Sequence, residues 1–187
     1  MNARLHIVRA APEHLPALAA IELAAAEQFP LVDLPAPRRA DRVPLARLSE
    51  ARSRALLWIA LDDGAAPAGF ALAGYVDGRL HLEELAVHPS QQRRGLGAAL
   101  VEHVVAEARE VACPLLTLTT FRYVPWNAPW YRRLGFRELS SEELGPELRA
   151  ILAHEVTLGL DPQRRVALGL DPFGPGLRTY GPPASSR

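Results

Sequence analysis

Short apolar runs separated by polar turns predict a series of β-strands along the chain. A proline, glycine or acidic turn bounds most of these runs, as is typical of strands in a folded domain. Asp77-Gly78 stands between two of them, and Asp-Gly at this position indicates a hairpin with antiparallel neighbours. The predicted strands cover residues 5–10, 56–61, 68–76, 80–87, 115–121 and 165–168, with a further strand starting at Phe136.

Other segments carry apolar residues at helical spacing. In the helix expected from Leu96, positions 96, 100, 104 and 108 fall on one face. This helix lies between the strands at 80–87 and 115–121, which predicts a βαβ unit with parallel strands. Further helices are expected over residues 12–28, 45–55 and 142–155, and a short one from Asn127 to Gly135.

Composition indicates a globular protein of one domain. The chain has 187 residues, of which 49% are hydrophobic. We expect the domain to cover residues 1–170, and the Pro-, Gly- and Ser-rich residues 171–187 to form a mobile tail. A net charge of zero gives no case for a nucleic-acid or membrane-surface partner. Cys113 is the only cysteine, which excludes an internal disulfide and a cysteine-rich metal site, and no metal is expected.

Targeting signals are not apparent in the sequence. The N-terminus has no charged segment followed by an apolar core and a cleavage site. No apolar run approaches the roughly 18 residues of a membrane span. We therefore expect a soluble cytoplasmic protein.

A loop rich in arginine and glycine joins the strand at 80–87 to the helix that follows. Gly95 and Gly97 let backbone N–H groups approach a ligand, and the helix start adds free N–H groups and a positive dipole end. Arg93 and Arg94 add full charge. The loop predicts a phosphate or pyrophosphate site. The alternative is an ordinary helix start with two solvated arginines. Rossmann and Walker patterns fit poorly, because Leu100 replaces a glycine and no lysine follows either glycine.

This segment resembles motif A of the GCN5-related N-acetyltransferase (GNAT) family. The match consists of Leu85-Ala86-Val87-His88-Pro89 followed by Gln92-Arg93-Arg94-Gly95-Leu96-Gly97. The resemblance implies a mixed α/β fold, with a mostly antiparallel sheet of six or seven strands, helices on both faces and a splayed central strand pair. It also implies that the loop holds the pyrophosphate of acetyl-CoA and that the strand backbone holds its pantetheine arm. The cofactor-binding residues so implied are Leu85, Ala86, Val87, Gln92, Arg93, Arg94, Gly95, Leu96, Gly97, Ala98 and Asn127.

A second matching segment, Tyr131-x-x-x-Gly135-Phe136, supplies a candidate catalytic residue. Tyr131 occupies the position of the family's general-acid tyrosine. A phenol titrates near 10 and a thiol near 8.5, so tyrosine can protonate a leaving thiolate. The alternative is a tyrosine that only packs its helix onto the sheet. Asn127 lies only four residues before Tyr131, closer than in many family members. We expect it to cap the short helix, and the resemblance adds a contact to CoA.

Glu83 and Glu84 are adjacent carboxylates in an otherwise apolar strand. Adjacent strand residues face opposite sides of a sheet, so one can face an acceptor cleft while the other is exposed or paired with an arginine. The resemblance implies that Glu83 acts as a base through water and that Glu84 contacts the substrate. A salt-bridged surface pair is the alternative. His81 and His88 are further candidate proton acceptors.

Together these residues predict an acetyl-CoA-dependent N-acetyltransferase. The acceptor would be a primary amine of a small cationic molecule, an amino acid derivative or a protein N-terminus, attacking directly in a ternary complex. The sequence leaves open a homodimer, which is common among similar proteins. It also leaves open the use of another acyl-CoA, and a non-catalytic CoA-binding sensor or interaction module.

Overall fold

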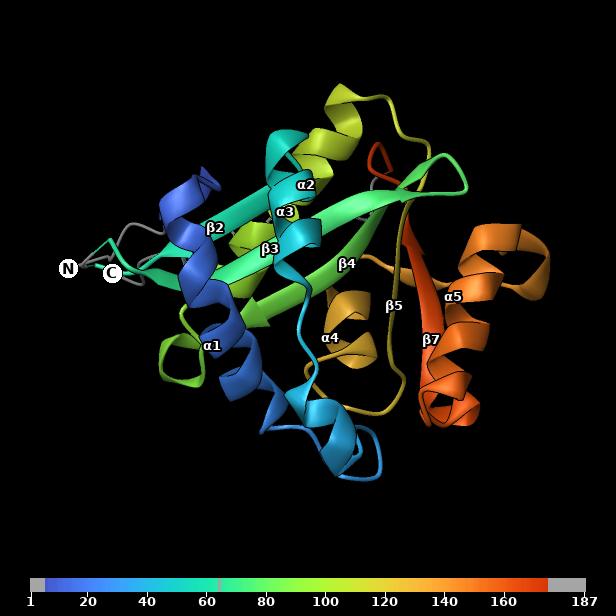
Figure 1. Ribbon diagram of the computed structural model, residues 1–187. Helices are drawn as coiled ribbons and strands as arrows, with labels where there is room; N and C mark the ends of the chain where they lie inside the picture. The colour runs from blue at the N-terminus through green and yellow to red at the C-terminus, as the bar shows by residue number, and fades with distance from the viewer. Residues whose placement is uncertain (1–5, 64, 175–187) are drawn as a thin grey trace, which may run out of the picture.

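The predicted strands pair into one seven-stranded sheet, in the order β1-β2-β3-β4-β5-β7-β6 (Figure 1). The computed structural model describes residues 6–63 and 65–174, so most of the predicted tail, residues 175–187, lies outside the described residues. All neighbouring strands are antiparallel except β4 and β5, which confirms the mixed, mostly antiparallel sheet. The strands are β1 (His6–Arg9), β2 (Leu57–Leu61), β3 (Pro67–Val76), β4 (Arg79–Val87), β5 (Leu116–Phe121), β6 (Arg137–Glu138) and β7 (Arg165–Leu170).

Two predicted helices begin later than the sequence pattern indicates. Residues 12–14 form a 3-10 turn before α1, and residues 141–143 form another before α5. Pro146 explains the second shift: proline suits the first helical turn, and it keeps Gly145 extended, with ψ at 173°. The helices are α1 (Leu15–Ala26), α2 (Leu45–Ser53), α3 (Leu96–Glu110), α4 (Ala128–Arg133) and α5 (Pro146–Thr157).

Helices cover both faces of the sheet. In Figure 1, α1 and α2 lie in front of β2, β3 and β4, and α3 lies behind them. The main core between these layers includes the fully buried side chains of Trp58, Phe70, Leu100 and Leu118. None of the helices in the described ranges is long and apolar enough to cross a membrane.

A smaller core lies under α5, which packs beside β7 (Figure 1). The Asp77-Gly78 turn of the predicted hairpin holds the start of this helix. The carboxylate of Asp77 accepts hydrogen bonds from the backbone N–H groups of Glu147 (2.8 Å) and Leu148 (3.0 Å). The hairpin therefore caps α5 at its N-terminus, where unpaired N–H groups favour a carboxylate.

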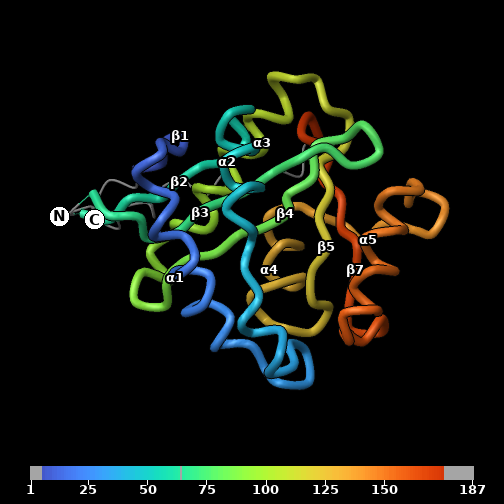
Figure 2. The backbone as a smooth tube through the Cα atoms, viewed as in Figure 1, coloured from blue at the N-terminus to red at the C-terminus, as the bar shows by residue number. Residues whose placement is uncertain are grey.

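The sheet splits between β4 and β5. These strands run parallel, as predicted, but pair only at His81 with Thr117 and at Leu82 with Leu118. Glu83, the next residue of β4, is the extra residue of a β-bulge against β3. A bulge bends its strand and increases its twist. Beyond it the two strands diverge, as the traces in Figures 1 and 2 show, so the β5-facing edge of β4 has no strand partner from residue 83 onward.

Candidate active site

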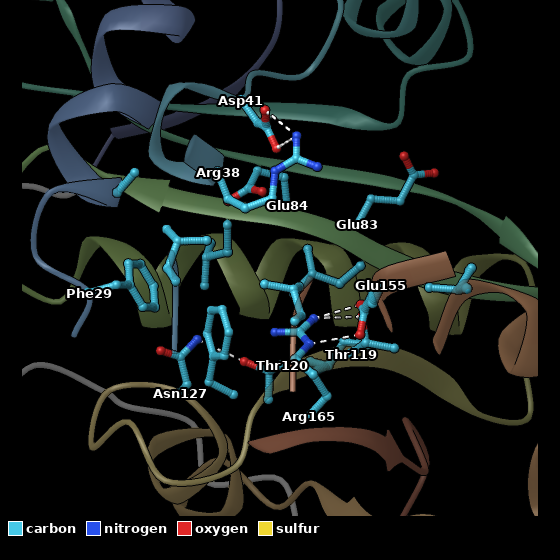
Figure 3. Close-up of a pocket in the computed structure, with 18 of the residues that line it drawn as sticks. Phe29, Arg38, Asp41, Glu83, Glu84, Thr119, Thr120, Asn127, Glu155 and Arg165 are labelled. Carbon is cyan, nitrogen blue, oxygen red and sulfur yellow. Dashed lines mark hydrogen bonds and ion pairs between the residues drawn. The ribbon is translucent and has the colours of Figure 1, made fainter. Parts of the chain in front are cut away.

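A cavity of about 500 Å³ lies where β4 and β5 separate. Side chains from both halves of the sheet and from α1, α4 and α5 line it. Figure 3 shows Glu84, Arg38 and Asp41 on one side, with Arg165, Glu155 and Thr119 across from them. All three predicted catalytic residues, Glu83, Glu84 and Tyr131, line this cavity.

Glu83 is engaged in an ion pair with α2. Arg47 Nε donates to Glu83 Oε2 at 3.0 Å, and Arg47 Nη2 contacts Glu83 Oε1. Arg47 Nη2 also donates to the Ala73 carbonyl oxygen at 3.2 Å, and the Glu83 carboxylate raises the pKa of the guanidinium. Gly74 on β3 leaves room for this pair, because a Cβ there would displace the Glu83 carboxylate and the Arg47 guanidinium. The charge of Glu83 is therefore balanced within the protein.

Glu84 lies half-buried on the cavity wall and forms no ion pair among the described residues. Burial raises the pKa of its carboxyl to about 7, and the negative charge of Glu22 adds to this rise. A hydrogen bond to the Leu85 backbone and the charge of Arg165 oppose it. A carboxyl with this pKa can take up and release a proton near neutral pH.

Tyr131 faces the same cavity from α4 and is also packed. Its side chain is buried, and its ring lies 4.8 Å from that of Trp130 and 5.4 Å from that of Phe136. Burial, reinforced by the charge of Glu84, raises the pKa of the phenol well above its ordinary range. The hydroxyl therefore stays protonated at any physiological pH and is available as a donor.

Asn127 is the N-cap residue of α4, as predicted, but its side chain does not form the capping hydrogen bond. Its Nδ2 donates instead to Thr120 Oγ1 at 2.8 Å, at the end of β5 (Figure 3). Its backbone carbonyl accepts from the N–H of Tyr131 at 2.9 Å. Asn127 Oδ1 is buried and has no hydrogen-bond partner in the described part of the chain. Since Asn127 lines the cavity, this oxygen is a candidate ligand contact.

The arginine- and glycine-rich loop leaves the end of β4 and leads into α3. Arg93 and Gly95 both adopt positive φ values, 59° and 87°, and Gly95 is the N-cap of α3. The first N–H groups of the helix, those of Leu96, Gly97 and Ala98, have no acceptor within the helix itself. A Cβ at Gly97 would approach only the Trp130 ring, at 3.6 Å, and Val87.

The polar side chains of this loop differ in what they contact. Gln92 Nε2 donates to the Val87 carbonyl at 3.1 Å and to Gln28 Oε1 at 2.9 Å, which fixes the loop to β4 and to the end of α1. Arg94 pairs with Asp63 at 2.9 Å. Arg93 is exposed. Of the two predicted anion-binding arginines, Arg94 is therefore partly neutralised.

Sequence reasoning missed a buried ion pair on the far side of the cavity. Arg165 donates from Nε and Nη2 to the two carboxylate oxygens of Glu155, each at 2.7 Å. Thr119 Oγ1 donates to the same carboxylate at 2.7 Å. Strand β5 itself carries no glutamate, and α5 supplies a carboxylate beside it instead. Only the fold could reveal this pair, because its members come from separate elements.

Glu22 and the pair formed by Arg38 and Asp41 were also missed as cavity residues. Arg38 Nη2 lies 2.7 Å from Asp41 Oδ1. Both residues lie in the segment between α1 and α2, where the sequence showed only a proline- and charge-rich loop. Glu22 did carry a local signal, because it is an acidic residue between Ile21 and Leu23 in an alanine- and leucine-rich helix.

The segment that follows α1 contacts residues near the end of β5 and the start of β7. Phe29, just after α1, lies 5.2 Å from the ring of Phe121 and 5.9 Å from that of Trp126. Asp33 is buried and accepts a hydrogen bond from Arg164 Nε at 2.8 Å. These contacts join the segment after α1 to the ends of β5 and the start of β7.

The two histidines are poor candidates for the proton acceptor. His81 is buried, its Nδ1 lies 2.9 Å from Thr117 Oγ1, and burial lowers the pKa of its imidazole to about 4. His88 does not line the cavity, and its Nδ1 lies 2.8 Å from Ser90 Oγ in the turn after β4. Within residues 6–63 and 65–174, no group of three or more His, Cys, Asp or Glu side chains could hold a metal ion.

Residues 18–136 match the model of the acetyltransferase (GNAT) family, which covers more than half of the chain. The protein therefore belongs to the GNAT family.

Solved structures agree in fold. N-acetylglutamate synthase from Neisseria gonorrhoeae, complexed with coenzyme A and N-acetyl-glutamate, matches 93% of this chain with a TM-score of 0.66 and 22% identity. The match covers 36% of that protein, so the chain spans about a third of its length. The ribosomal-protein-S18-alanine N-acetyltransferase from Escherichia coli matches 93% of this chain and 99% of its own, with a TM-score of 0.59 and 22% identity. Rv2747 from Mycobacterium tuberculosis, in complex with CoA and NLQ, matches 89% and 98%, with a TM-score of 0.64 and 17% identity. At these identities the likeness shows the fold alone.

Proposed function

We propose that this protein is an acetyl-CoA-dependent N-acetyltransferase that moves an acetyl group to a primary amine by direct attack in a ternary complex. One observation carries the proposal: the sheet opens beside a bulge in β4, and two candidate acid–base residues, Glu84 and Tyr131, face the resulting cavity. A glycine loop suited to a pyrophosphate follows at the end of the same strand. The acceptor would be a small cationic amine, an amino acid derivative or a protein N-terminus.

The residues for binding acetyl-CoA are backbone groups more than side chains. The N–H groups of Leu96, Gly97 and Ala98 point out of the start of α3 and suit a pyrophosphate, with Arg93 adding charge. The unpaired edge of β4 at 85–87 suits the amides of a pantetheine arm, because its N–H and C=O groups on that side lack a strand partner. Asn127 Oδ1 can accept a hydrogen bond from the same arm.

Glu84 is the better of the two glutamates for the role of base. Arg47 engages both carboxylate oxygens of Glu83, so that side chain is committed to an ion pair within the protein. Glu84 has no such partner, and burial brings its pKa to about 7. It can therefore take the proton of an ammonium group, directly or through one water, before the neutral amine attacks.

Tyr131 is suited to protonate the leaving thiolate. Its hydroxyl is protonated at neutral pH and faces the cavity, while the ring is fixed by Trp130 and Phe136. The developing negative charge on the carbonyl oxygen would meet the backbone N–H of Val87 on the free edge of β4, because the register with β3 turns the N–H of Ala86 to the other side. Acetyl-CoA supplies the acetyl group and the thiol leaving group.

Two measurements test the proposal. Calorimetric titration with coenzyme A should give a saturable heat. Thiol release from acetyl-CoA should then depend on an added primary amine, drawn from a panel of cationic amines, amino acid amides and short peptides. Binding without thiol release for any amine would leave a CoA-binding module and refute the enzyme. If propionyl-CoA or succinyl-CoA released thiol faster than acetyl-CoA, the transferred acyl group would be propionyl or succinyl instead of acetyl.

A further inference from the structure

Most charged side chains that line the cavity are neutralised by partners. Glu83 pairs with Arg47, and the buried Arg165 and Glu155 pair with each other. Arg38 and Asp41 form the third pair, with 2.6 Å between Arg38 Nη2 and Asp41 Oδ2. In the described part of the chain, Glu22 and Glu84 are the cavity carboxylates that form no ion pair.

Glu22 reaches this site from the middle of α1. Its two carboxylate oxygens each lie 3.1 Å from the backbone N–H of Val43, which fixes the side chain in place. Ala25 and Ala26, one turn further along the helix, face the same cavity and leave space next to it. Glu22 and Glu84 line the same cavity, and the negative charge of Glu22 raises the pKa of Glu84. Burial raises the pKa of Glu22 as well, while the Val43 N–H and the charge of Arg42 oppose that rise.

We propose that Glu22 is a second acceptor-binding residue, and that Glu22 and Glu84 together bind the acceptor as an ammonium ion. The inference rests on the proposed function, because it concerns the acceptor of that reaction. An ammonium group has three N–H donors and a positive charge, so it can hydrogen-bond to two carboxylates and offset their repulsion. Glu84 then takes one proton from the ammonium. The site would select amines that are protonated in solution over amines that are not.

The other charged groups around Glu84 do not remove this need for a cation. Arg165 faces it from β7 but is held by Glu155, and Tyr131 on α4 is uncharged at neutral pH. His81 on the same strand is uncharged as well, since burial holds its pKa near 4. Arg38 with Asp41 and Glu83 with Arg47 are internal pairs. Arg42 lowers the pKa of Glu22 through its charge, but it forms no ion pair with Glu22, and its Nη1 donates to the Asp41 carbonyl at 3.0 Å.

A structural role is the alternative, in which Glu22 only holds Val43. The variant Glu22→Gln separates the two roles, because the amide oxygen still accepts from the Val43 N–H while the charge is lost. Glu22→Asp keeps the charge and serves as the conservative variant. Glu27→Gln is a matched control, since Glu27 follows the same helix, does not line the cavity and pairs with Arg39.

The first measurement needs no acceptor. Carbon-13 NMR of the carboxyl groups follows the titration of Glu84 in the free protein, with the signal assigned by its loss in Glu84→Gln. We expect the midpoint to move to lower pH in Glu22→Gln, because a like charge is removed, and to stay in place in Glu27→Gln. Glu22→Asp should retain at least part of the raised midpoint. An unchanged midpoint in Glu22→Gln would overturn the inference.

The second measurement compares ethylamine, which is protonated at pH 7, with 2,2,2-trifluoroethylamine, which is mostly uncharged. In Glu22→Gln the kcat/KM for ethylamine should fall about 10-fold or more relative to wild type, mainly through KM. The same ratio for the fluorinated amine should stay within about twofold, because it makes no charged contact. Equal changes for both amines, or none, would overturn the inference and leave the proposed function intact.

Failure of the proposed function gives a different result. If acetyl-CoA releases no thiol with ethylamine or with any amine of the panel, the enzyme and its ammonium site are both refuted. A titration midpoint that still moves in Glu22→Gln would then show only that the two carboxylates are coupled. If thiol release depends on amines but Glu22→Gln behaves like wild type, the ammonium site alone is refuted.

Discussion

Replacing Glu84 with glutamine should stabilise the protein at alkaline pH, even though it should abolish amine acetylation. The carboxyl has a pKa of about 7 in the folded protein, compared with 4.5 for an ordinary glutamate. A raised folded-state pKa means that the folded protein binds the proton more tightly than the unfolded chain. The stability from this proton is fully present below pH 4.5 and is lost as the pH rises through 7. Glutamine carries no charge and avoids that loss.

The size of the effect follows from the two pKa values. At about 1.4 kcal/mol per pH unit, the interval from 4.5 to about 7 corresponds to about 3 kcal/mol above pH 8. For a protein of this size, that difference would raise the melting temperature by about 6–12 °C. At pH 4 the glutamate is protonated in both states, so the two proteins should have similar stability.

Urea denaturation of wild type and Glu84→Gln at a series of pH values from 4 to 9 measures this directly. The difference in the free energy of unfolding should rise between pH 4.5 and 7 and then level off. Glu83→Gln is the control: it breaks an ion pair with Arg47, so it should cost about 1 kcal/mol at pH 8 and show no such rise. If the difference in unfolding free energy did not change with pH, or if Glu84→Gln were less stable than wild type at pH 8, the raised pKa of the Glu84 carboxyl would be refuted.

Three further changes test other parts of the site. Tyr131→Phe keeps the ring contact with Trp130 but removes the acid, so kcat should fall about 100-fold while calorimetry with CoA is unchanged; an unchanged kcat would exclude the acid role. Gly97→Glu should weaken CoA binding at least about tenfold, because it places a negative charge at the proposed pyrophosphate site. Gly97→Ala should still bind CoA, because its Cβ fits at 3.6 Å from the Trp130 ring. Equal affinities of the two variants for CoA would show that the pyrophosphate binds at another place. Asp33→Asn should lower the urea midpoint, because it removes the charge of a buried partner of Arg164; an unchanged midpoint would show that this ion pair does not stabilise the fold.

Most of the strands and helices could be predicted because their patterns are local. The alternation of β4, the helical face of α3 and the Asp77-Gly78 turn each indicate their structure within a few residues. The order of the sheet is different. Strand β7 lies between β5 and β6, although it comes last in the chain, and no local pattern encodes that insertion.

Predictions about the site divide in the same way. The loop with Gly95 and the tyrosine at 131 follow from short motifs, and the structure places Tyr131 at the cavity and the loop between β4 and α3. The partner of Glu83 is 36 residues away on α2, and the Glu155 carboxylate beside β5 comes from another helix. Asn127 is the N-cap of its helix as expected, but its side chain bonds to Thr120 on a separate strand instead of to the helix. Each of these contacts forms across the molecule, so sequence spacing does not indicate it.

The bulge at Glu83 depends on the number of residues in β4 more than on the side chain at position 83. Pairing of β4 with β5 stops at Leu82, one residue before the extra residue. A substitution at position 83 leaves the extra residue in the strand, whereas deleting it would remove the bulge that bends β4. Strands β4 and β5 could then continue to pair beyond Leu82, and backbone hydrogen bonds between them would close the cavity. A one-residue deletion should therefore damage this protein more than any substitution at the same position.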